Sequence, residues 1–463
     1  MKSLSFILLA GALSAQTVDL TKPPETPPLA AYKLPPVSEA TLSNGLRVVT
    51  VRDARFPIVT VKLGFQAGSK FDPKEQTGLA ETAAALLKEG TKRRNDRQIA
   101  DEMANLGGAL EVVSSADNLQ ITASALSENT AKLLDLLADV VRNAEFPEAE
   151  LKLRKQNRAQ ELMAQRADSA TQADEKFQEA LFGAHPYSRL LPTEQSLAKI
   201  DRATLLNFRK QFLAPNNAVL ILVGALPAQG ELMKLLEAQF ASWPKNATPA
   251  APAPAFPTAE RSLTLVDRPA SVQADIKIGR LGIDRTNPDY FPLMVANNIL
   301  GGGASSRLFV HFREEKGYAY DVHTEFVPLR NAGSFNVTTQ VRNDVIQPAI
   351  DDLLAEMKRI GSEPVSTTEL TDVKNFIAGN FVLRLETQAG LASQLGLVKL
   401  QGLPNDYLET FVTRVRSVEP DQILRAAKKY ISPEASAMIV VGDAAKLAKP
   451  LEKFGAVTLE KAK

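Results

Sequence analysis

Short stretches in which apolar and polar residues alternate recur along the chain and predict β-strands. They occupy residues 46–53, 110–126, 263–269 and 334–342, where β-branched residues stand between polar ones. The longer segments between them carry apolar residues at helical spacing, as amphipathic helices do. Paired strands with helices packed on one side indicate an α+β fold, in which antiparallel-rich sheets are covered by helices.

The pattern is duplicated within the chain. Segments 211–226 and 429–444 each contain an aromatic residue, a proline, an apolar strand and a closing glycine, and these anchors all lie 218 residues apart. Segments 58–68 and 273–283 also correspond, since each is a strand followed by a long helical stretch. The repeat predicts two homologous halves of about 200 residues each, a common size for a domain.

An Ala/Pro-rich segment separates the halves and favours an extended, semi-stiff linker. Two similar halves on such a linker suggest a clamshell. The predicted organisation is a signal peptide at 1–15, a Pro-rich arm at 16–40, an N-terminal domain at 41–243, the linker at 244–262 and a C-terminal domain at 263–463.

The first residues have the pattern of a secretory signal, with Lys2, an apolar stretch at 4–13 and small residues around Ala15. A buried N-terminal helix is the alternative interpretation. The apolar stretch is too short to cross a bilayer, and no later stretch is long and apolar enough, so we expect no membrane insertion. We therefore expect a secreted protein, periplasmic if the source is Gram-negative.

Composition narrows the possible chemistry. The formal net charge of +1 gives no electrostatic reason to expect a nucleic-acid partner or an anionic membrane. The chain has no cysteine, which excludes disulfides, thiol nucleophiles and cysteine-ligated zinc.

A predicted helix at 79–91 carries a run of very small residues where a core-facing helix usually has bulky ones. With the residues that frame it, this segment resembles the pitrilysin and mitochondrial-processing-peptidase family of zinc endopeptidases, the inverzincins. The family pattern is Gly-Leu-Ala-His-x-x-Glu-His followed by Gly-Thr and Leu-Gly-Gly. The framing residues present here are Gly78-Leu79-Ala80, Gly90-Thr91 and Leu106-Gly107-Gly108.

The reactive positions of that motif are replaced. By the resemblance, the first histidine ligand falls on Glu81, the catalytic glutamate on Ala84 and the second histidine on Ala85. The third ligand falls on Glu161, and an accessory carboxylate on Arg154, whose charge would repel a cation.

Positions i, i+3 and i+4 share one face of a helix, which is why the family motif can direct three ligating groups at one metal. Two carboxylates without nitrogen do not satisfy the preference of zinc for three protein ligands. We therefore expect no metal in this chain and no general base to activate water. The alternative is that the alanines only allow another helix to approach closely. His185, His311 and His323 are expected to have structural or surface roles.

The second half keeps a different part of the family chemistry. Arg313 and Tyr320 lie seven residues apart within "SSRLFVHFREEKGYAY". The resemblance implies that such a pair reaches the metal site, hydrogen-bonds the substrate backbone and stabilises the oxyanion. The alternative is a surface salt bridge for Arg313 and a packed strand position for Tyr320.

Active particles in this family can be dimers of two similar chains, only one of which bears the zinc motif. The resemblance therefore implies the zinc-less subunit of a heterodimeric metalloendopeptidase that degrades or processes peptides, with zinc in the partner and Arg313 and Tyr320 acting there in trans. An unfolded peptide is expected to pair with an edge strand at 109–116, beside Glu111, Val112, Val113 and Ser114. Two alternatives remain, a non-catalytic homodimeric peptide-binding or scaffolding protein and an enzyme that uses unrelated residues.

Overall fold

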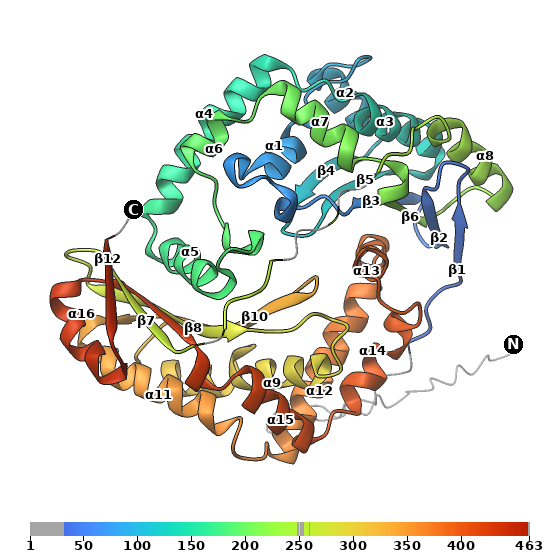
Figure 1. Ribbon diagram of the computed structural model, residues 1–463. Coiled ribbons are helices and arrows are strands. Elements are labelled where there is room, and N and C mark those ends of the chain that lie inside the picture. Colours follow the sequence, from blue (N-terminus) through green and yellow to red (C-terminus); the bar gives the residue numbers. More distant parts are fainter. Residues whose placement is uncertain (1–31, 248–249, 251–253, 259, 462–463) are drawn as a thin grey trace, which may run out of the picture. The chain divides into compact units, whose positions relative to one another are not determined.

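Two mixed six-stranded sheets, one from each half of the chain, form the framework of the protein (Figure 1). The computed structural model describes residues 32–247, 250, 254–258 and 260–461. The predicted signal peptide and most of the predicted Pro-rich arm lie outside the described residues, as do positions 248–249, 251–253 and 259 of the predicted linker.

The N-terminal sheet has the strand order β1-β2-β6-β3-β5-β4. Strands β2 and β6 are parallel and the other neighbours are antiparallel. The first strand begins four residues before the expected start of the folded part near Thr41, because residues of the predicted arm pair with β2. The strands are β1 (Val37–Thr41), β2 (Arg47–Arg52), β3 (Ile58–Phe65), β4 (Ala109–Ser114), β5 (Leu119–Leu126) and β6 (Ala218–Gly224).

The C-terminal sheet has the equivalent order β12-β7-β11-β8-β10-β9. Strand β7 is parallel to both β11 and β12, and the other pairs are antiparallel. The strands are β7 (Ser262–Asp267), β8 (Gln273–Leu281), β9 (Val322–Leu329), β10 (Ala332–Arg342), β11 (Ala437–Gly442) and β12 (Val457–Lys461).

Strand register confirms the duplication predicted from the sequence. Lys62 of β3 pairs with Ile221 of β6, and Lys277 of β8 pairs with Ile439 of β11. The two isoleucines keep the offset of 218 residues seen in the sequence repeat. Only the outermost strands differ, since β1 is antiparallel to its neighbour and β12 is parallel.

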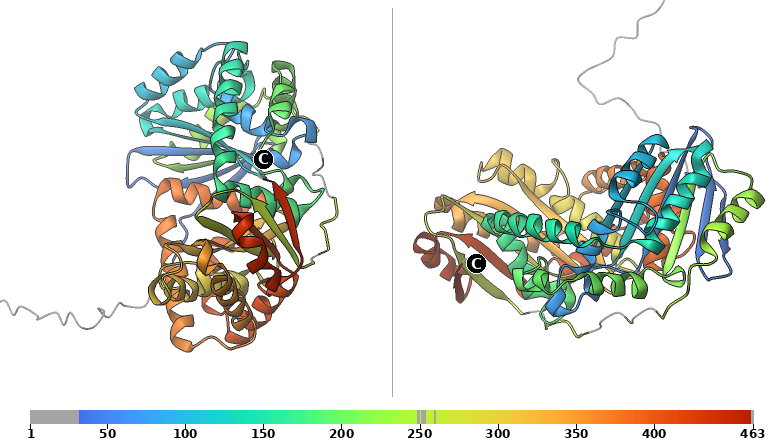
Figure 2. Two further views of the ribbon diagram at one scale, coloured as in Figure 1. Left: turned by 90° about the vertical axis from the view of Figure 1, so that its left-hand side faces the viewer. Right: turned by 90° about the horizontal axis from the view of Figure 1, so that it is seen from above.

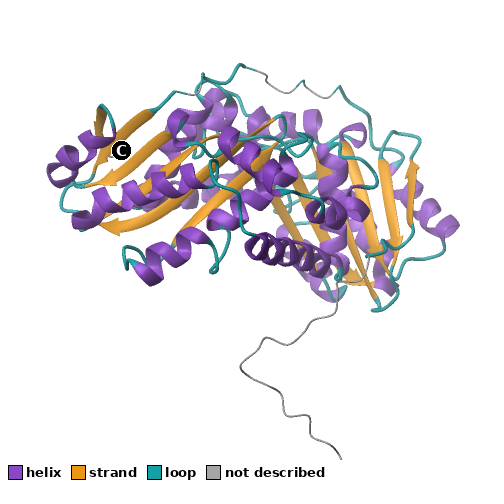
Figure 3. Ribbon diagram, turned by 90° about the horizontal axis from the view of Figure 1, so that it is seen from below, coloured by secondary structure: helices purple, strands orange, loops and turns teal. Residues whose placement is uncertain are grey.

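Helices flank both sheets (Figure 3). Those of the N-terminal half are α1 (Leu79–Leu86), α2 (Asp96–Asn105), α3 (Thr130–Asn143), α4 (Glu148–Ala167), α5 (Ser169–Phe182), α6 (Glu194–Ala198), α7 (Arg202–Phe212) and α8 (Gln229–Phe240). Those of the C-terminal half are α9 (Tyr290–Gly301), α10 (Arg307–Phe309), α11 (Ile346–Arg359), α12 (Thr367–Leu385), α13 (Gln388–Gln401), α14 (Tyr407–Arg416), α15 (Pro420–Tyr430) and α16 (Ala444–Leu451). None of the helices within the described residues is long and apolar enough to cross a membrane.

Each sheet is also covered by one helix from the opposite half (Figures 1 and 2). Helix α13 packs on β3 and β6 of the N-terminal sheet. Because side chains alternate along a strand, Val61 and Leu63 face the N-terminal core while Lys62 and Gly64 face α13. The Lys62 amine donates to Ser393 at 3.1 Å, and a Cβ on Gly64 would lie 2.7 Å from Leu400.

Helix α5 makes the reciprocal contact with β8 and β11 of the C-terminal sheet. Lys277 forms an ion pair with Asp174 of α5 and lies over the ring of Phe177. Phe177 itself is fully buried in a cluster shared with Ile439 and Val441 of β11.

The structure confirms the predicted α+β halves, each a sheet covered by helices. The sequence predicted helices on one side of each sheet and did not predict the cover of the other side. Strands β6 and β11 are apolar and buried on both faces, so both faces need a cover. The second cover comes from the other half of the chain.

The exchange of α5 and α13 predicts that the two halves unfold together. Phe177→Ala should lower the free energy of unfolding by about 3–5 kcal/mol, since it leaves a cavity in the shared cluster. Urea unfolding followed by far-UV circular dichroism measures the shift. Phe56→Ala is the matched control, because that ring is 61% exposed. Two separate unfolding transitions, with only one shifted by Phe177→Ala, would contradict the coupling.

Candidate functional site

Helix α1 carries the predicted metal-ligand positions Glu81, Ala84 and Ala85. It begins after Gly78, whose φ of +98° is in the left-handed region that glycine tolerates. The Asp72 carboxylate accepts hydrogen bonds from the backbone N–H groups of Gly78 at 2.9 Å and Ala80 at 3.0 Å. These contacts satisfy N–H groups that the first turn of a helix leaves without partners.

The small residues of α1 allow close packing. The helix contacts β4, α4 and α7. Ala83 and Ala84 belong to the hydrophobic core of the N-terminal half, and Ala84 is only 3% exposed. Ala85 is partly exposed. Close helix packing is therefore a real function of two of these alanines, and the predicted catalytic position holds a buried methyl group.

Four charged side chains form a closed cluster between α1 and α4. Arg154 contacts Glu81 at 2.9 Å and Glu161 at 3.1 Å. Arg158 contacts the same two carboxylates at 2.9 Å and 3.4 Å. Each carboxylate thus faces two guanidinium groups.

This cluster opposes metal binding at the predicted positions. The two guanidiniums carry the same +2 charge as a zinc ion and already neutralise the two carboxylates. The described residues contain no group of three His, Cys, Asp or Glu side chains that could hold a metal.

Arg158 is the functional residue that the sequence reasoning missed. Its side chain is 8% exposed, and it also donates to Gln165 at 2.8 Å. Arg154, Arg158 and Glu161 follow the i, i+4, i+7 spacing of one helix face, which is the signal that could have revealed it.

Arg313 and Tyr320 lie together in the C-terminal half. Arg313 is on the π-helix η6 (Val310–Glu315), and its guanidinium lies 4.3 Å from the centre of the Tyr320 ring. Tyr320 is 80% exposed and precedes β9. Arg313 has no ion-pair partner in the part of the chain that the structure describes. The alternatives of a surface salt bridge and a packed strand residue therefore do not match the geometry.

The predicted substrate strand is β4, which lies at the edge of its sheet and pairs with β5 alone. Leu110 and Val112 pack against the core, whereas Glu111 and Val113 alternate with them and are exposed. An edge strand leaves backbone N–H and C=O groups available to another strand. Val113 is 51% exposed, so this edge also offers apolar surface.

Comparison with known proteins assigns the family. A sequence model described as "Insulinase (Peptidase family M16)" matches residues 47–193, and one described as "Peptidase M16 inactive domain" matches residues 199–377. The chain belongs to peptidase family M16.

Individual M16 relatives resemble the chain along most of its length. The zinc protease YmxG of Bacillus subtilis is 24% identical over 409 residues, which cover 87% of this chain and 98% of the relative. A zinc protease of Rickettsia bellii is 25% identical over 407 residues, with 86% and 96% covered. This M16 chain is thus a homologue of zinc proteases.

Solved structures agree with this assignment. The crystal structure of a peptidase M16 inactive domain from Pseudomonas fluorescens superposes on this chain with a TM-score of 0.81 at 26% sequence identity. The superposition covers 88% of this chain and 98% of that one. A protease from Helicobacter pylori also has a TM-score of 0.81 at 20% identity, over 89% of this chain and 100% of that one, and it shares the fold.

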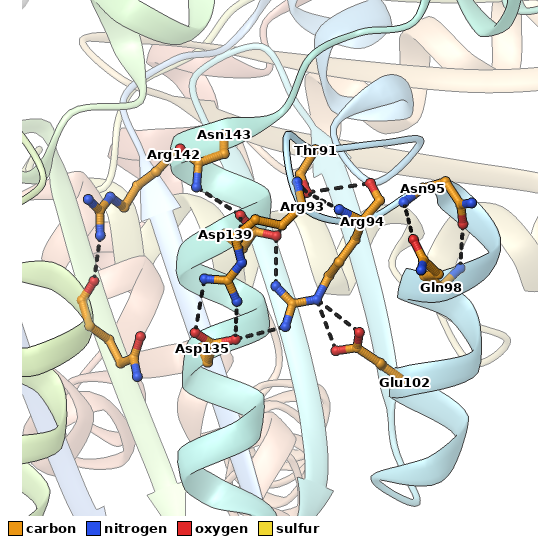
Figure 4. A network of polar contacts seen from close by, with 11 residues as sticks. Thr91, Arg93, Arg94, Asn95, Gln98, Glu102, Asp135, Asp139, Arg142 and Asn143 are labelled. Carbon is orange, nitrogen blue, oxygen red and sulfur yellow. Dashed lines mark hydrogen bonds and ion pairs between the residues drawn. The ribbon is translucent and has the colours of Figure 1, made fainter.

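The Gly90-Thr91 pair that frames the M16 helix is held by a buried polar network (Figure 4). The Thr91 hydroxyl donates to Asp139 at 2.8 Å, and Arg94 donates to Asp139 at 2.7 Å and to Asp135 at 2.8 Å. Burial acts to raise the pKa of Asp139, but hydrogen bonds from Asn143, Arg94 and Thr91 outweigh it and lower that pKa below its ordinary value. The network anchors the turn after α1 to helix α3.

The Leu106-Gly107-Gly108 turn has a steric cause. Gly107 has a φ of +66°. A Cβ on Gly108 would lie 1.8 Å from the Ser124 carbonyl oxygen of β5, so only glycine fits where this M16 chain turns into β4.

The three histidines do not form a site. The buried His185 ring accepts a hydrogen bond from the Tyr187 backbone N–H at 3.1 Å, and burial lowers its pKa. His311 contacts Glu315 and Asp352, and His323 contacts Asp321. These separate local contacts agree with the structural and surface roles expected of them.

Removing the two arginines should make the site able to bind zinc once histidines are restored. Glu81→His with Ala85→His supplies two ring nitrogens beside Glu161 and leaves the buried Ala84 unchanged. Adding Arg154→Gln and Arg158→Gln should then strengthen zinc binding by about tenfold or more, since it frees the third ligand. Competition with a chromophoric chelator measures the affinity. Arg97→Gln is the control, because Arg97 is 87% exposed in a surface pair. Equal zinc affinity with and without the two arginines would contradict this account.

The Asp139 network predicts a pH-dependent contribution to stability. Asp139→Asn should lower the free energy of unfolding by about 3 kcal/mol at pH 7, because it breaks a buried ion pair. A carboxyl with a lowered pKa stabilises the fold above its unfolded pKa of about 4, and this contribution disappears as the pH falls through the folded value. The difference between the wild type and the variant should therefore shrink below about pH 4.

Urea unfolding at pH 7 and at pH 3.5 measures both differences. Asp101→Asn is the control, since its carboxylate is 68% exposed and pairs only at the surface. A difference for Asp139→Asn that is equal at the two pH values would refute the proposed charge interaction.

Proposed function

We propose that this protein is the zinc-less subunit of an exported heterodimeric M16 metalloendopeptidase that degrades or processes peptides. Its partner is a homologous chain with the H-x-x-E-H motif, and Arg313 and Tyr320 contribute to the partner's active site. The observation that carries the proposal is the contrast between two regions. The metal positions hold the Glu81–Arg154–Arg158–Glu161 cluster, whereas Arg313 and Tyr320 are exposed with their donors free.

The geometry of the pair suits the stabilisation of negative charge. The Arg313 guanidinium carbon lies over the Tyr320 ring, 4.3 Å from its centre. A cation–π contact restrains the guanidinium and leaves the N–H groups in its plane free to donate. In the proposed particle, Arg313 and Tyr320 hydrogen-bond the substrate carbonyl and its developing oxyanion. Zinc held by the H-x-x-E-H motif of the partner would supply the activated water.

Substrate binding is proposed to use the free edge of β4. A peptide that adds a strand beside Glu111 and Val113 forms backbone hydrogen bonds irrespective of its sequence, as β-augmentation does. Only an unfolded segment has its backbone free for this pairing. The proposed substrates are therefore unfolded peptides.

The second candidate is a non-catalytic homodimeric protein that binds peptides or acts as a scaffold. Two observations favour it. Strand β4 lies at the edge of its sheet, and Arg154 and Arg158 form ion pairs with Glu81, one of the predicted metal-ligand positions. Peptide capture on β4 requires neither Arg313 nor Tyr320.

The test is peptide hydrolysis by the purified chain, by a zinc-motif partner and by their mixture. We expect activity in the mixture above that of either chain alone. Arg313→Ala and Tyr320→Phe should each lower kcat by roughly a hundredfold with little change in KM, because they remove donors used in the transition state. Arg342→Ala is the control, since Arg342 is an exposed arginine of the same half.

An unchanged kcat of the mixture with Arg313→Ala and Tyr320→Phe would overturn the shared site. No gain of activity on mixing, together with peptide binding by this chain alone, would favour the scaffolding function. Hydrolysis by this chain alone in excess chelator would indicate an enzyme that uses other residues.

A further inference from the structure

A polar pocket lies in the C-terminal half and contains none of the predicted site residues. It has a volume of about 490 Å³ and is formed by the segment before α9, the first turn of α9, the connection between α13 and α14, and the end of α14. It shares no residue with the Arg313–Tyr320 pair or with the α1–α4 cluster.

Two cations line this pocket without a counter-charge. The Arg285 side chain donates to the Tyr290 hydroxyl and lies 5.3 Å from that ring, and Arg414 lies 5.8 Å from the ring of Phe291. Neither arginine forms an ion pair with any described residue, and no Asp or Glu is among the lining residues. In a chain with 54 basic and 53 acidic residues, two unopposed arginines beside one cavity require an explanation.

The aromatic hydroxyls beside the pocket hold one of the arginines in place. Tyr407 lines the pocket, is only 1% exposed, and its hydroxyl interacts with Tyr290. The Tyr290 hydroxyl in turn accepts a hydrogen bond from Arg285. The Arg285 Nε is buried and has no partner among the described residues, so this guanidinium keeps unused donor capacity at the pocket.

The pocket is preorganised by its own backbone. The Asp284 carboxylate accepts hydrogen bonds from the backbone N–H groups of Thr286 at 2.8 Å and Asn287 at 3.1 Å, which fixes the segment that carries Arg285. The first turn of the twelve-residue α9 also lines the pocket, and the N-terminus of a helix favours an anion.

The remaining wall is apolar. Phe291, Leu403 and Val418 line it together with prolines at positions 288, 292 and 404. A small inorganic anion would leave this surface uncovered, whereas an organic anion with an apolar body would cover it.

We propose that this pocket binds an organic carboxylate with an apolar or aromatic body. The carboxylate accepts hydrogen bonds from Arg285 and Arg414, and the body packs on Phe291 and the prolines. Such a group occurs in a free organic acid and at the C-terminal residue of a peptide. The proposal does not depend on the peptidase function, because the pocket is complete within this chain.

Isothermal titration of the full-length chain tests the proposal with three carboxylate probes, N-acetyl-phenylalanine, 3-phenylpropanoate and a tripeptide that ends in phenylalanine. The amide of N-acetyl-phenylalanine is the neutral control, and inorganic phosphate is the control for a bare anion. We expect saturable binding of a carboxylate probe and none of the amide. Binding of 3-phenylpropanoate would assign a free acid, and binding of the tripeptide alone would assign a peptide terminus.

Variants locate the site. Arg414→Gln should weaken binding by about tenfold or more, because it removes a charged donor. Arg416→Gln is the matched control, since Arg416 is exposed on the same helix outside the pocket.

No saturable binding of any carboxylate probe would overturn the proposal. So would equal affinity for the amide, preferential binding of phosphate, or an affinity that Arg414→Gln leaves unchanged.

Discussion

The structure depends on the need to cover both faces of each sheet. Strands β6 and β11 are apolar and buried on both faces, and one of these faces would be exposed to water if each half folded alone. The exchange of α5 and α13 resolves this, because each helix seals the sheet of the other half. The two contacts are chemically related, since Lys62 and Lys277 occupy equivalent positions and each reaches a polar residue of the exchanged helix. We therefore expect the two halves to fold as one unit, because each sheet is completed by a helix of the other half.

Within that framework, the predicted metal positions of the N-terminal half hold an ion-pair cluster. The positive charge that the carboxylates require comes from Arg154 and Arg158. These two guanidinium groups belong to α4 and hold α1 against it, but they cannot activate water. In the C-terminal half, by contrast, Arg313 and Tyr320 are exposed and lie against each other without an ion-pair partner among the described residues. This contrast is the basis of the proposed division of the chemistry between two chains.

Much of this could be predicted from the sequence, for physical reasons specific to each element. The duplication was visible because β6 and β11 are buried on both faces and therefore keep the same apolar pattern. The resemblance placed the edge strand β4 directly after the Gly107-Gly108 turn, where the backbone passes too close to β5 for any side chain. Arg158 was missed because its importance arises only when α4 docks against α1. The exchange of helices could not be predicted either, since a local pattern shows that a helix face is apolar but does not show which sheet it meets. Strand β1 was not predicted, because it lies in the Pro-rich arm and joins the sheet by pairing with β2 and by the ion pair of Glu39 with Lys399.

The claim that connects these observations is that two guanidinium groups occupy the cation position of an M16 metal site. The most direct measurement is the zinc content of the isolated wild-type chain after equilibration with equimolar zinc and gel filtration, determined by inductively coupled plasma mass spectrometry. The account predicts that the protein fraction carries no stoichiometric zinc. One tightly held zinc per chain, lost on Glu161→Gln, would contradict it.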